Sequence, residues 1–419
     1  MTKKRLAAKG MFTTRHELDD ATTVGRFKTK ASAFTRNRKM GFAKIVLCLL
    51  NFMKKSLTIE IERFHDFTGG QGPAMSKQAF SKARQNIDPE LFRHLLRKAT
   101  VEPFMEPDVA ERHKGYRVFA IDGTDIEIEP TKENLKYYGT KGSDTACRAK
   151  ASFLCEVIDG VIIDAIIGNN GNERTLAEEH IEYFSRFATE KDLIVFDRGY
   201  PGKKLIADLF DRNIKFLMRL QKSFDMNIDK DERNDFYADM KHKGSTYRLR
   251  VIKFLLESGE EETLITNLEP EDFGTEDFKE LYFMRWAIET KYNLLKNCLL
   301  IEHFTGKTRT SIEQDFYAAA YLSNMAAFVQ SDADHVIAEE DSHKKLKHKR
   351  QVNRQLLIGM LKDKFILMTL CDNADVRNAM LDSIMEKLVR YKTDIRPGRH
   401  YPRPDDCHHR RRHRLKGVL

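Results

Sequence analysis

The sequence predicts an α/β protein in which a central α/β domain lies between two helical regions. From about residue 116, short apolar runs typical of buried strands alternate with segments of helical periodicity. Before this point the apolar residues follow helical spacing, and a long helical pattern returns after residue 300. At 419 residues with 41% hydrophobic content, the chain is long enough for two or three domains with a sizeable core.

The N-terminal third is expected to be helical. Residues 1 to about 25 are mostly polar, so we expect them to be loosely ordered. A helix with one apolar face is expected over Phe42–Met53, and Ser76 is a plausible N-cap for a helix over Lys77–Asn86. A further helix over Pro89–Leu96 would follow a three-residue break. The last two helices could form a helix-turn-helix-like DNA reader or an ordinary helical hairpin, and both readings stay open.

The central domain has the element order β-β-β-α-β-α-β. We expect strands at Val118–Ile121, Ala149–Ile158, Val161–Ile167, Leu193–Phe196 and Lys215–Leu220, with helices at Glu173–Ala188 and Gly202–Arg212. This is the order of a ribonuclease H-like fold, in which acidic residues come from strand 1, strand 4 and a later helix. A β-rich insertion with strand-like Tyr247–Leu256 and Glu262–Asn267 follows, and Ile312–Phe328 is typical of a long helix.

These elements suggest four parts. We expect a helical N-terminal DNA-binding region at 1–110, a ribonuclease H-like catalytic domain at 111–330 with an insertion at about 221–274, a C-terminal helical region at 331–390 and a basic tail at 391–419.

Charge favours a polyanionic partner, although many soluble proteins are mildly basic. The formal net charge is +9, and the stretch Arg26–Lys55 holds nine Lys or Arg and no acid. The tail from Tyr391 holds nine basic residues against three Asp. Six scattered Cys without a C-x-x-C pair fit a reducing cytoplasm, and Cys407, His408 and His409 are too closely spaced for a convincing zinc site. No signal peptide and no apolar run near 18 residues is evident.

Two acidic motifs share one pattern. In VFAIDGTDIE and DLIVFDRGY, an apolar run ends on Asp122 or Asp197, and a Gly follows within two residues. Taken singly, such an Asp is more often a turn residue than a catalyst. Neighbouring strands could bring both carboxylates together, where they would repel unless cations occupied the site. Asp125, Asp164 and Asp192 are rival acids that rank lower, because none of them lies at a strand exit before Gly.

A third acidic position lies in the stretch LYFMRWAIETKYNLLK, from Leu281 to Lys296. Tyr282, Arg285, Glu289 and Lys296 are offset by 3, 7 and 14 residues, which on a continuous helix places them within an arc of roughly 60°. A carboxylate can hold a hard divalent cation, while the phenol and the cations can grip a polyanion. A solvated helix face is the alternative for this stretch alone.

The three acids together resemble the triad of a bacterial DDE transposase of the insertion-sequence-four (IS-four) family. The resemblance rests on Asp, Asp and Glu in this order, the last inside Y-x-x-R-x-x-x-E-x-x-x-x-x-x-K, and it extends to LIEHFTGKT, SIEQDFYAAAYLSNMAAF and parts of the N-terminal third. It implies that Asp122, Asp197 and Glu289 bind the metal and catalyse. It also implies that Tyr282, Arg285 and Lys296 contact DNA near the scissile phosphate.

The resemblance implies further partners. A DDE transposase of this family would use two Mg²⁺ ions, with Mn²⁺ as a possible substitute, to cut transposon ends and join them to target DNA. It would bind double-stranded DNA, act as a homodimer when two ends are synapsed, and lie in the bacterial cytoplasm with the nucleoid. A ribonuclease H-like nuclease or resolvase without strand transfer, and an inactive DNA-binding relative, remain the alternatives.

One departure from the family concerns tryptophan. Relatives that form a hairpin intermediate can use a Trp outside the signature helix to hold a flipped base. The only Trp here is Trp286, inside that helix, so we expect it to be a packing residue. The base-stacking group is therefore not identified by sequence.

Overall fold

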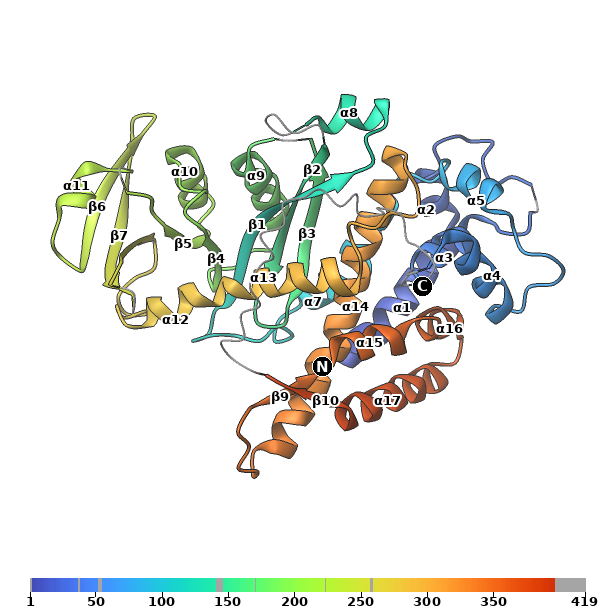
Figure 1. The fold of residues 1–419 in the computed structure, drawn as a ribbon. Coiled ribbons are helices and arrows are strands. Elements are labelled where there is room, and N and C mark those ends of the chain that lie inside the picture. Colours follow the sequence, from blue (N-terminus) through green and yellow to red (C-terminus); the bar gives the residue numbers. More distant parts are fainter. Residues whose placement is uncertain are drawn as a thin grey trace.

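The computed structural model describes residues 2–36, 38–51, 55–140, 146–169, 171–222, 224–256 and 259–395, without the side chains of Trp286, Thr290, Asn293 and Asn297. Two predictions therefore fall outside the described residues. They are the packing role of the Trp286 side chain and the basic tail beyond residue 395. Its centre is one eight-stranded sheet with strand order β3-β2-β1-β4-β5-β8-β7-β6 (Figure 1). The N-terminal helices and the strands β6 and β7 lie at opposite ends of the molecule in this view.

The sheet is mixed. Its strands are β1 (Arg117–Ile128), β2 (Cys147–Glu156), β3 (Val161–Gly168), β4 (Asp192–Phe196), β5 (Lys215–Arg219), β6 (Asp235–His242), β7 (Ser245–Leu255) and β8 (Glu261–Thr266). The strands β1, β4 and β5 are mutually parallel, whereas β2 and β3 pair antiparallel on one side and β8 antiparallel on the other. The five strands expected from sequence are therefore confirmed in type and order.

β1 is longer than the sequence suggested. We expected a strand that ends at Ile121, but β1 has 12 residues and continues beyond Asp122 to Ile128. The apolar run ends at residue 121 because the parallel partner β4 ends there, at the pair Ile121↔Phe196. Antiparallel pairing with β2 continues to Ile128↔Cys147 and carries the polar residues onward as strand. Residue 121, where we expected β1 to end, is therefore only the end of its pairing with β4, and β1 continues through its pairing with β2.

The β-rich insertion extends the main sheet instead of forming a separate body. β8 pairs with β5 through Met218↔Ile265, and the hairpin β6–β7 continues outward from β8. The helix α11 (Met226–Lys230) precedes β6. Consecutive residues of both strands are buried, Leu249 to Lys253 in β7 and Leu264 to Thr266 in β8, and their apolar members are the ones that predicted these strands.

The expectation of a loosely ordered N-terminus was wrong. α1 (Lys3–Asp19) is a 17-residue helix whose Leu6, Ala7 and Met11 are fully buried. A Cβ added at Gly10 would meet the side chain of Met325 and the carbonyl of Ala99 at under 3 Å, because the helix lies so close to its neighbours. A few apolar residues on one face suffice when the partner helix is itself apolar.

The other N-terminal helices are short. They are α2 (Ala21–Arg26), α3 (Phe42–Leu49), α4 (Leu57–Phe67), α5 (Lys77–Arg84), α6 (Glu90–Leu96), the π-helical turn η1 (Arg97–Val101) and α7 (Glu102–Phe104). Ser76 caps α5 by accepting a hydrogen bond from Ala79 N at 3.3 Å, as its sequence suggested. Arg84 on α5 is buried and forms an ion pair with Asp315, so it is not free to read DNA.

Helices pack on both faces of the sheet. On one face α9 (Glu173–Phe184) contacts β1 through the rings of Phe184 and Phe119, whose centroids are 4.8 Å apart. α8 (Lys132–Tyr138) and α10 (Lys203–Asp211) complete this half of the domain. On the other face Phe153 of β2 packs against Tyr292 and Phe316, at centroid distances of 5.6 and 5.2 Å.

The expected continuous helix from Leu281 to Lys296 is broken. It consists of α12 (Asp277–Met284), α13 (Trp286–Asn293) and a π-helical turn η2 (Leu294–Cys298), which run one after another across the sheet in Figure 1. Arg285 lies at the break, so the ideal spacing of the four signature residues does not hold. A turn and a π segment in place of regular helix are common near functional sites.

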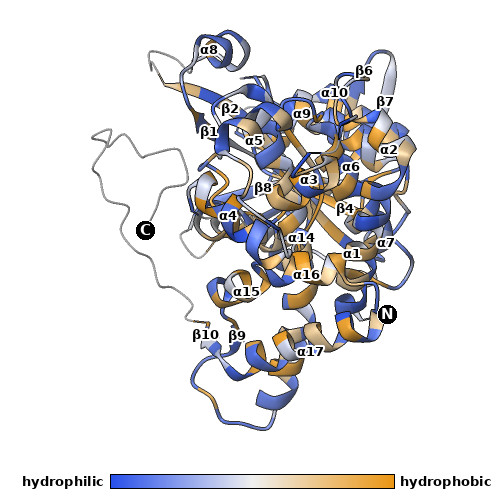
Figure 2. Ribbon diagram, turned by 90° about the vertical axis from the view of Figure 1, so that its right-hand side faces the viewer, coloured by the Kyte–Doolittle hydropathy of each residue, from blue (hydrophilic) through white to orange (hydrophobic). Residues whose placement is uncertain are grey.

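A single long helix links the sheet to the C-terminal region. α14 (Arg309–Asp341) has 33 residues, and the domain boundary expected at residue 330 lies within it. In Figure 2 α14 runs through the interior with many hydrophobic residues, whereas α8 at the periphery is mostly hydrophilic. The C-terminal elements are β9 (Arg350–Val352), α15 (Arg354–Leu361), α16 (Lys364–Leu370), α17 (Ala374–Arg390) and β10 (Lys392–Asp394). None of the helices in the described ranges is long and apolar enough to cross a bilayer.

Candidate active site

The register of the sheet places Asp122 beside Asp197. The parallel ladder of β1 and β4 ends at Ile121↔Phe196, so these two acids are the next residues along neighbouring strands. Adjacent strands lie roughly 4.8 Å apart, which brings the two backbones close. The sequence signal, an apolar run that ends on Asp, thus marks one shared edge of the parallel strands.

Asp122 is held in an environment that disfavours its charge. Burial raises the pKa of its carboxyl to about 6, and the carboxylates of Asp197 and Glu173 act in the same direction. The N–H of Gly123, which donates to Asp122 Oδ1 at 2.9 Å, and the charge of Arg285 oppose the shift only in part. Close acids whose repulsion is not fully compensated are typical of functional sites.

Tyr282 contacts the second acid. Its hydroxyl donates to Asp197 Oδ1 at 3.1 Å from the last turn of α12. Burial raises the pKa of Tyr282 to about 12, and the charge of Asp197 acts in the same direction, so the hydroxyl keeps its proton and can donate. α12 therefore reaches the edge of β4 through this phenol.

Arg285 lies between the acids. Its side chain is 8% exposed, and its charge acts on Asp197, Asp122 and Glu289. The Nη2 atom of Arg285 lies 3.3 Å from Glu289 Oε1. Its Nε atom is buried and has no hydrogen-bond partner in the part of the chain that the structure describes. Glu289 itself points outward, with 59% of its side chain exposed. Glu289 is therefore paired with Arg285, whose charge also acts on the two aspartates.

Lys296 reaches the same edge from η2. Its Nζ donates to Thr124 Oγ1 at 3.0 Å and lies 3.3 Å from Glu302 Oε1. The neighbouring helix is fixed to β1 by Tyr292, whose hydroxyl donates to the carbonyl oxygen of Asp122 at 2.6 Å. The break at Arg285 and the π turn therefore still leave Tyr282, Arg285 and Lys296 facing the edge where Asp122 lies.

Sequence reasoning missed Glu173, the first residue of α9. A Cβ added at Gly123 would lie 3.2 Å from Glu173 Oε1, and one at Gly199 would lie 3.9 Å from Oε2. The Gly after each aspartate therefore leaves room for this carboxylate, which Lys150 holds at 2.9 Å. Gly123 and Gly199 were the sequence signal that another group approaches the backbone closely here. The sequence does not identify that group as Glu173, because Glu173 is distant from both glycines along the chain.

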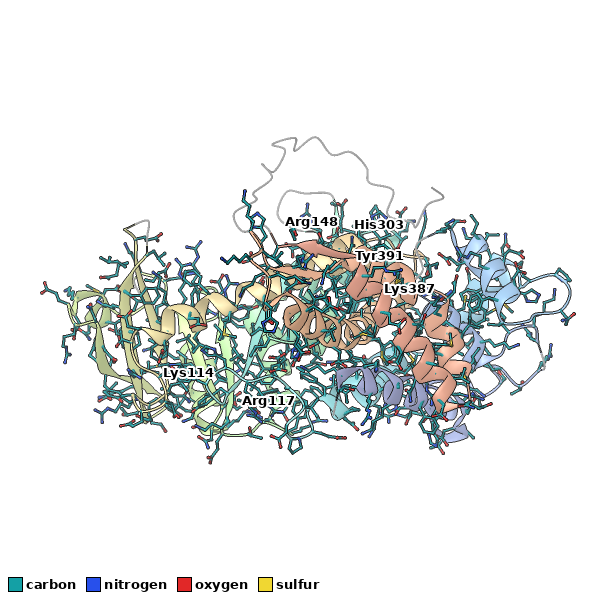
Figure 3. The ribbon with its side chains drawn as sticks, turned by 90° about the horizontal axis from the view of Figure 1, so that it is seen from below. Lys114, Arg117, Arg148, His303, Lys387 and Tyr391 are labelled. Carbon is teal, nitrogen blue, oxygen red and sulfur yellow. The ribbon has the colours of Figure 1, made fainter. Side chains whose placement is uncertain are left out.

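The rival acids are engaged elsewhere. Asp192 forms a buried pair with Arg117 through two contacts of 2.6 Å, at the start of β1. In Figure 3 Arg117 lies on the opposite side of the view from Arg148, which pairs with the far end of β1. Asp125 forms an ion pair with Lys150 at 2.9 Å.

Asp164 is the most strongly paired of the rival acids. It is fully buried and accepts hydrogen bonds from Arg93 at 3.1 Å, Arg97 at 2.9 Å and His180 at 2.9 Å. His180 Nε2 in turn lies 3.0 Å from Ser152 Oγ. A Ser, His and Asp in this order resemble a hydrolytic triad, but all three are buried and no substrate can reach them. The network instead ties α6 and η1 to β3.

The residues at the edge suit a hard divalent cation in their chemistry. Asp122 and Asp197 offer oxygen ligands, and the buried hydroxyl of Tyr200 has no hydrogen-bond partner among the described residues. Burial raises the pKa of Tyr200 well above its ordinary value, and the charges of Asp122, Glu173 and Asp197 add to this effect. However, no three His, Cys, Asp or Glu within the described ranges lie close enough to hold a metal ion. Glu289 would have to turn from Arg285 to join the aspartates.

Comparison with known proteins gives one family. The sequence matches none of the curated proteins, and it is similar to the piggyBac transposase solved by cryo-EM as a synaptic complex with hairpin DNA. That similarity has 11% identity and a TM-score of 0.46, and it covers 95% of this chain and 87% of the other. Residues 113–325, about half of the 419-residue chain, match the model of the transposase DDE domain. The chain therefore belongs to the transposase DDE domain family.

Proposed function

We propose that this protein is a DNA transposase that cuts the ends of an insertion sequence and joins them to target DNA. The observation that carries the proposal is the pair Asp122 and Asp197 at the shared end of the β1–β4 ladder, inside the matched domain. Asp122 is held there against charge repulsion, as expected of a site built to receive a cation.

The catalytic assignment is Asp122, Asp197 and Glu289, and these residues would hold two Mg²⁺ ions, with Mn²⁺ as a substitute. When bound, divalent ions would lower the pKa of a water molecule and neutralise charge on the phosphate. The charge of Arg285 acts on all three acids, and its guanidinium is paired with Glu289. We infer that Arg285 shifts onto a DNA phosphate when metal binds, which would release Glu289 for the site.

Tyr282, Arg285 and Lys296 are assigned to the DNA near the scissile phosphate. Lys296 and Arg285 would neutralise the phosphate oxygens, and Tyr282 would keep Asp197 oriented through its hydrogen bond of 3.1 Å. Their common approach to the edge of β1 and β4 supports this assignment, since a duplex laid on that edge would meet all three. Trp286 and the basic tail are not used in the proposal.

We also propose a more specific fold type, family and division of the chain. The strand order β3-β2-β1-β4-β5, with β2 antiparallel, supports a ribonuclease H-like catalytic core extended by β8, β7 and β6. The signature from Tyr282 to Lys296 supports the IS-four family. We retain the helical region 1–110 as a DNA-binding part, 111–330 as the catalytic part and 331–390 as the C-terminal part. The partner is double-stranded DNA, bound by a homodimer in the bacterial cytoplasm.

The experiment uses labelled duplexes taken from the genomic DNA that flanks the reading frame. With Mg²⁺, wild-type protein should nick these ends and join them to a plasmid, while Asp122→Asn, Asp197→Asn and Glu289→Gln should bind the ends without cutting. Asp125→Asn is the matched control, because Asp125 lies on the same strand in an ion pair with Lys150. If the wild-type protein cleaves the ends but does not join them, it is a nuclease or resolvase. If the wild-type protein binds the ends but does not cleave them, it is an inactive relative.

A further inference from the structure

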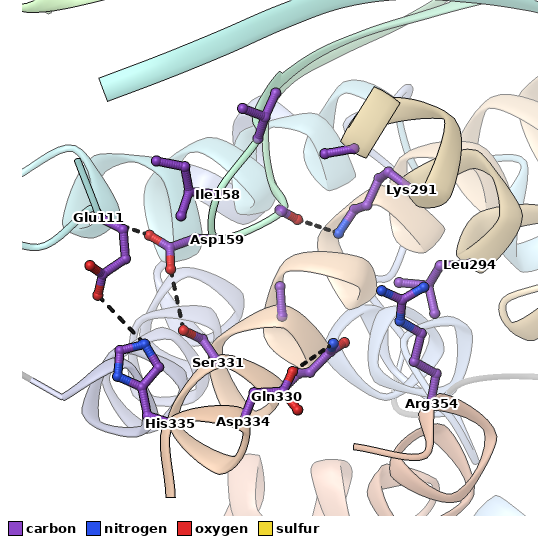
Figure 4. Close-up of a pocket in the computed structure, with 14 residues that line it drawn as sticks. Glu111, Ile158, Asp159, Lys291, Leu294, Gln330, Ser331, Asp334, His335 and Arg354 are labelled. Atoms are coloured by element: carbon purple, nitrogen blue, oxygen red, sulfur yellow. Dashed lines mark hydrogen bonds and ion pairs between the residues drawn. The ribbon is translucent and has the colours of Figure 1, made fainter. Parts of the chain in front are cut away.

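A polar cavity lies behind the signature helix. It has a volume of about 340 Å³ and lies between the β2–β3 turn, α13, α14 and the start of α15 (Figure 4). Its apolar wall includes Ile158, Ala287 and Leu294, and its polar wall carries both acids and cations. This is within the size range of small-ligand pockets, roughly 300–1,000 Å³.

The acids of the cavity are already compensated. Asp159 forms an ion pair with Lys3 at 2.5 Å, accepts from Glu111 N at 2.9 Å and from Ser331 at 3.2 Å. Asp334 accepts from Val352 N at 2.7 Å and from Gln330 at 3.0 Å. Both carboxylates are therefore held by hydrogen bonds inside the protein, and the charge of Asp334 also acts on Arg354.

The two cations of the cavity have few hydrogen-bond partners. Lys291 is 7% exposed, and its ammonium donates to the carbonyl oxygen of Gly160 at 2.5 Å. An ammonium carries three donors, and within the described residues this carbonyl is its hydrogen-bond partner. Arg354 Nε is also buried and has no partner in the part of the chain that the structure describes.

The two cations face the cavity from different parts of the fold. Figure 4 shows Lys291 on α13 and Arg354 at the first turn of α15, each near the cavity wall formed by Leu294. Lys291 follows Glu289 by two positions, which on a helix is roughly 200° around the axis. Lys291 therefore points away from the candidate active site, and the cavity is separate from it.

We propose that this cavity binds a small oxyanion of the phosphate class between Lys291 and Arg354. A phosphate has enough oxygens to accept hydrogen bonds from both side chains at once, and it would occupy the donors of Lys291 and Arg354 that have no partner among the described residues. Bound there, it would join the helix that carries Glu289 to the C-terminal region. The proposal does not use the catalytic assignment, so either can fail without the other.

The test measures binding of inorganic phosphate to the full chain by calorimetry, at constant ionic strength and without DNA or divalent ions. Wild type should bind. Arg354→Gln should weaken binding by about tenfold, as expected when one charged hydrogen-bond partner is lost, and Lys291→Met should abolish it. Arg390→Gln, which neutralises an exposed arginine on α17 outside the cavity, should bind as wild type does.

Absence of phosphate binding in wild type, or unchanged binding in Arg354→Gln, would overturn the proposal. Arg354 is only half-buried, so this variant remains informative if Lys291→Met does not fold. Two further arms identify the source of the phosphate group. Displacement of bound phosphate by a mononucleotide would indicate a small free ligand, whereas displacement by a short duplex would indicate a backbone phosphate of DNA.

Discussion

Asp164 and Asp122 are a buried and a half-buried acid of the same sheet, and they are held in opposite ways. Burial alone would raise the pKa of Asp164, but the hydrogen bond from His180 and the charges of Arg93 and Arg97 hold it well below its ordinary value. Burial raises the pKa of Asp122 to about 6, with neighbouring carboxylates adding to the effect. One acid is fully paired inside the protein, and the other lacks a sufficient partner.

The difference separates an acid with several charged partners from one whose charge is opposed by its surroundings. Asp164 contributes stability by linking β3 to the N-terminal helices and to α9. The charged form of Asp122 opposes folding near neutral pH, because burial and neighbouring carboxylates raise its pKa; sites that bind ligands commonly carry such a cost. From the sequence, Asp122 ranks above Asp164 because it follows an apolar run and precedes Gly. The contacts agree with this ranking, since Asp164 is paired with Arg93, Arg97 and His180.

The largest effect is expected for Asp164→Asn. This change leaves Arg93 and Arg97 without their shared carboxylate, and removing one partner of a buried pair costs about 3–5 kcal/mol. Denaturant unfolding of both proteins near neutral pH measures the difference. A loss below about 1 kcal/mol would place Asp164 among ordinary surface acids.

The same pair of proteins gives a pH dependence. Because the pKa of Asp164 is lowered on folding, its contribution to stability is fully present above 3.8, its ordinary pKa, and is lost as pH falls below it. The difference in free energy of unfolding between wild type and Asp164→Asn should therefore shrink in acid. A difference that stays constant down to strongly acidic pH would show that the charge of Asp164 is not what matters.

A smaller effect of opposite sign is expected for Asp122→Asn. Near neutral pH and without divalent ions, removing this charge should raise the free energy of unfolding by about 1–2 kcal/mol, because the cost of burying the charge is removed and the repulsion from Asp197 and Glu173 is relieved. Asp125→Asn, which breaks the ion pair with Lys150, provides the control and should not stabilise the protein. Destabilisation by Asp122→Asn would put Asp122 in the same class as Asp164.

The smallest effect concerns Gly123. An alanine there places its Cβ 3.2 Å from Glu173 Oε1, so we expect a loss of about 1 kcal/mol. The loss should vanish when Glu173→Ala is introduced as well, because the crowding carboxylate is then gone. A cost that persists in the double variant would mean that Gly123 is required by the backbone and not by Glu173.

The sequence predicted the elements whose signals are local. The apolar runs of β4 and β5, the cap at Ser76 and the long apolar pattern of α14 are read correctly because neighbouring residues determine them. The sequence did not predict that residues 3–19 form the ordered helix α1. The few apolar residues of α1 hold the helix in place only because α14 lies beside them. The sequence also missed the extension of β1, since pairing with β2 overrides the polar composition of that segment.

For the site, sequence found the residue types and the edge but not their contacts. The ideal spacing from Tyr282 to Lys296 assumed a continuous helix, which the break at Arg285 and the π turn contradict. Neither the position of Arg285 between the acids nor the approach of Glu173 behind two glycines has a local signal. Both depend on how α9 and α13 pack on the sheet.

Calorimetric titration of Mn²⁺ into the full chain tests most directly whether Asp122 belongs to a metal site. Wild type should bind the ion. Asp122→Asn should weaken binding by about tenfold or more, since it removes an oxygen ligand. Asp125→Asn, three residues along the same strand, should bind as wild type does. Equal binding by wild type and Asp122→Asn would contradict the assignment of this edge as the catalytic centre.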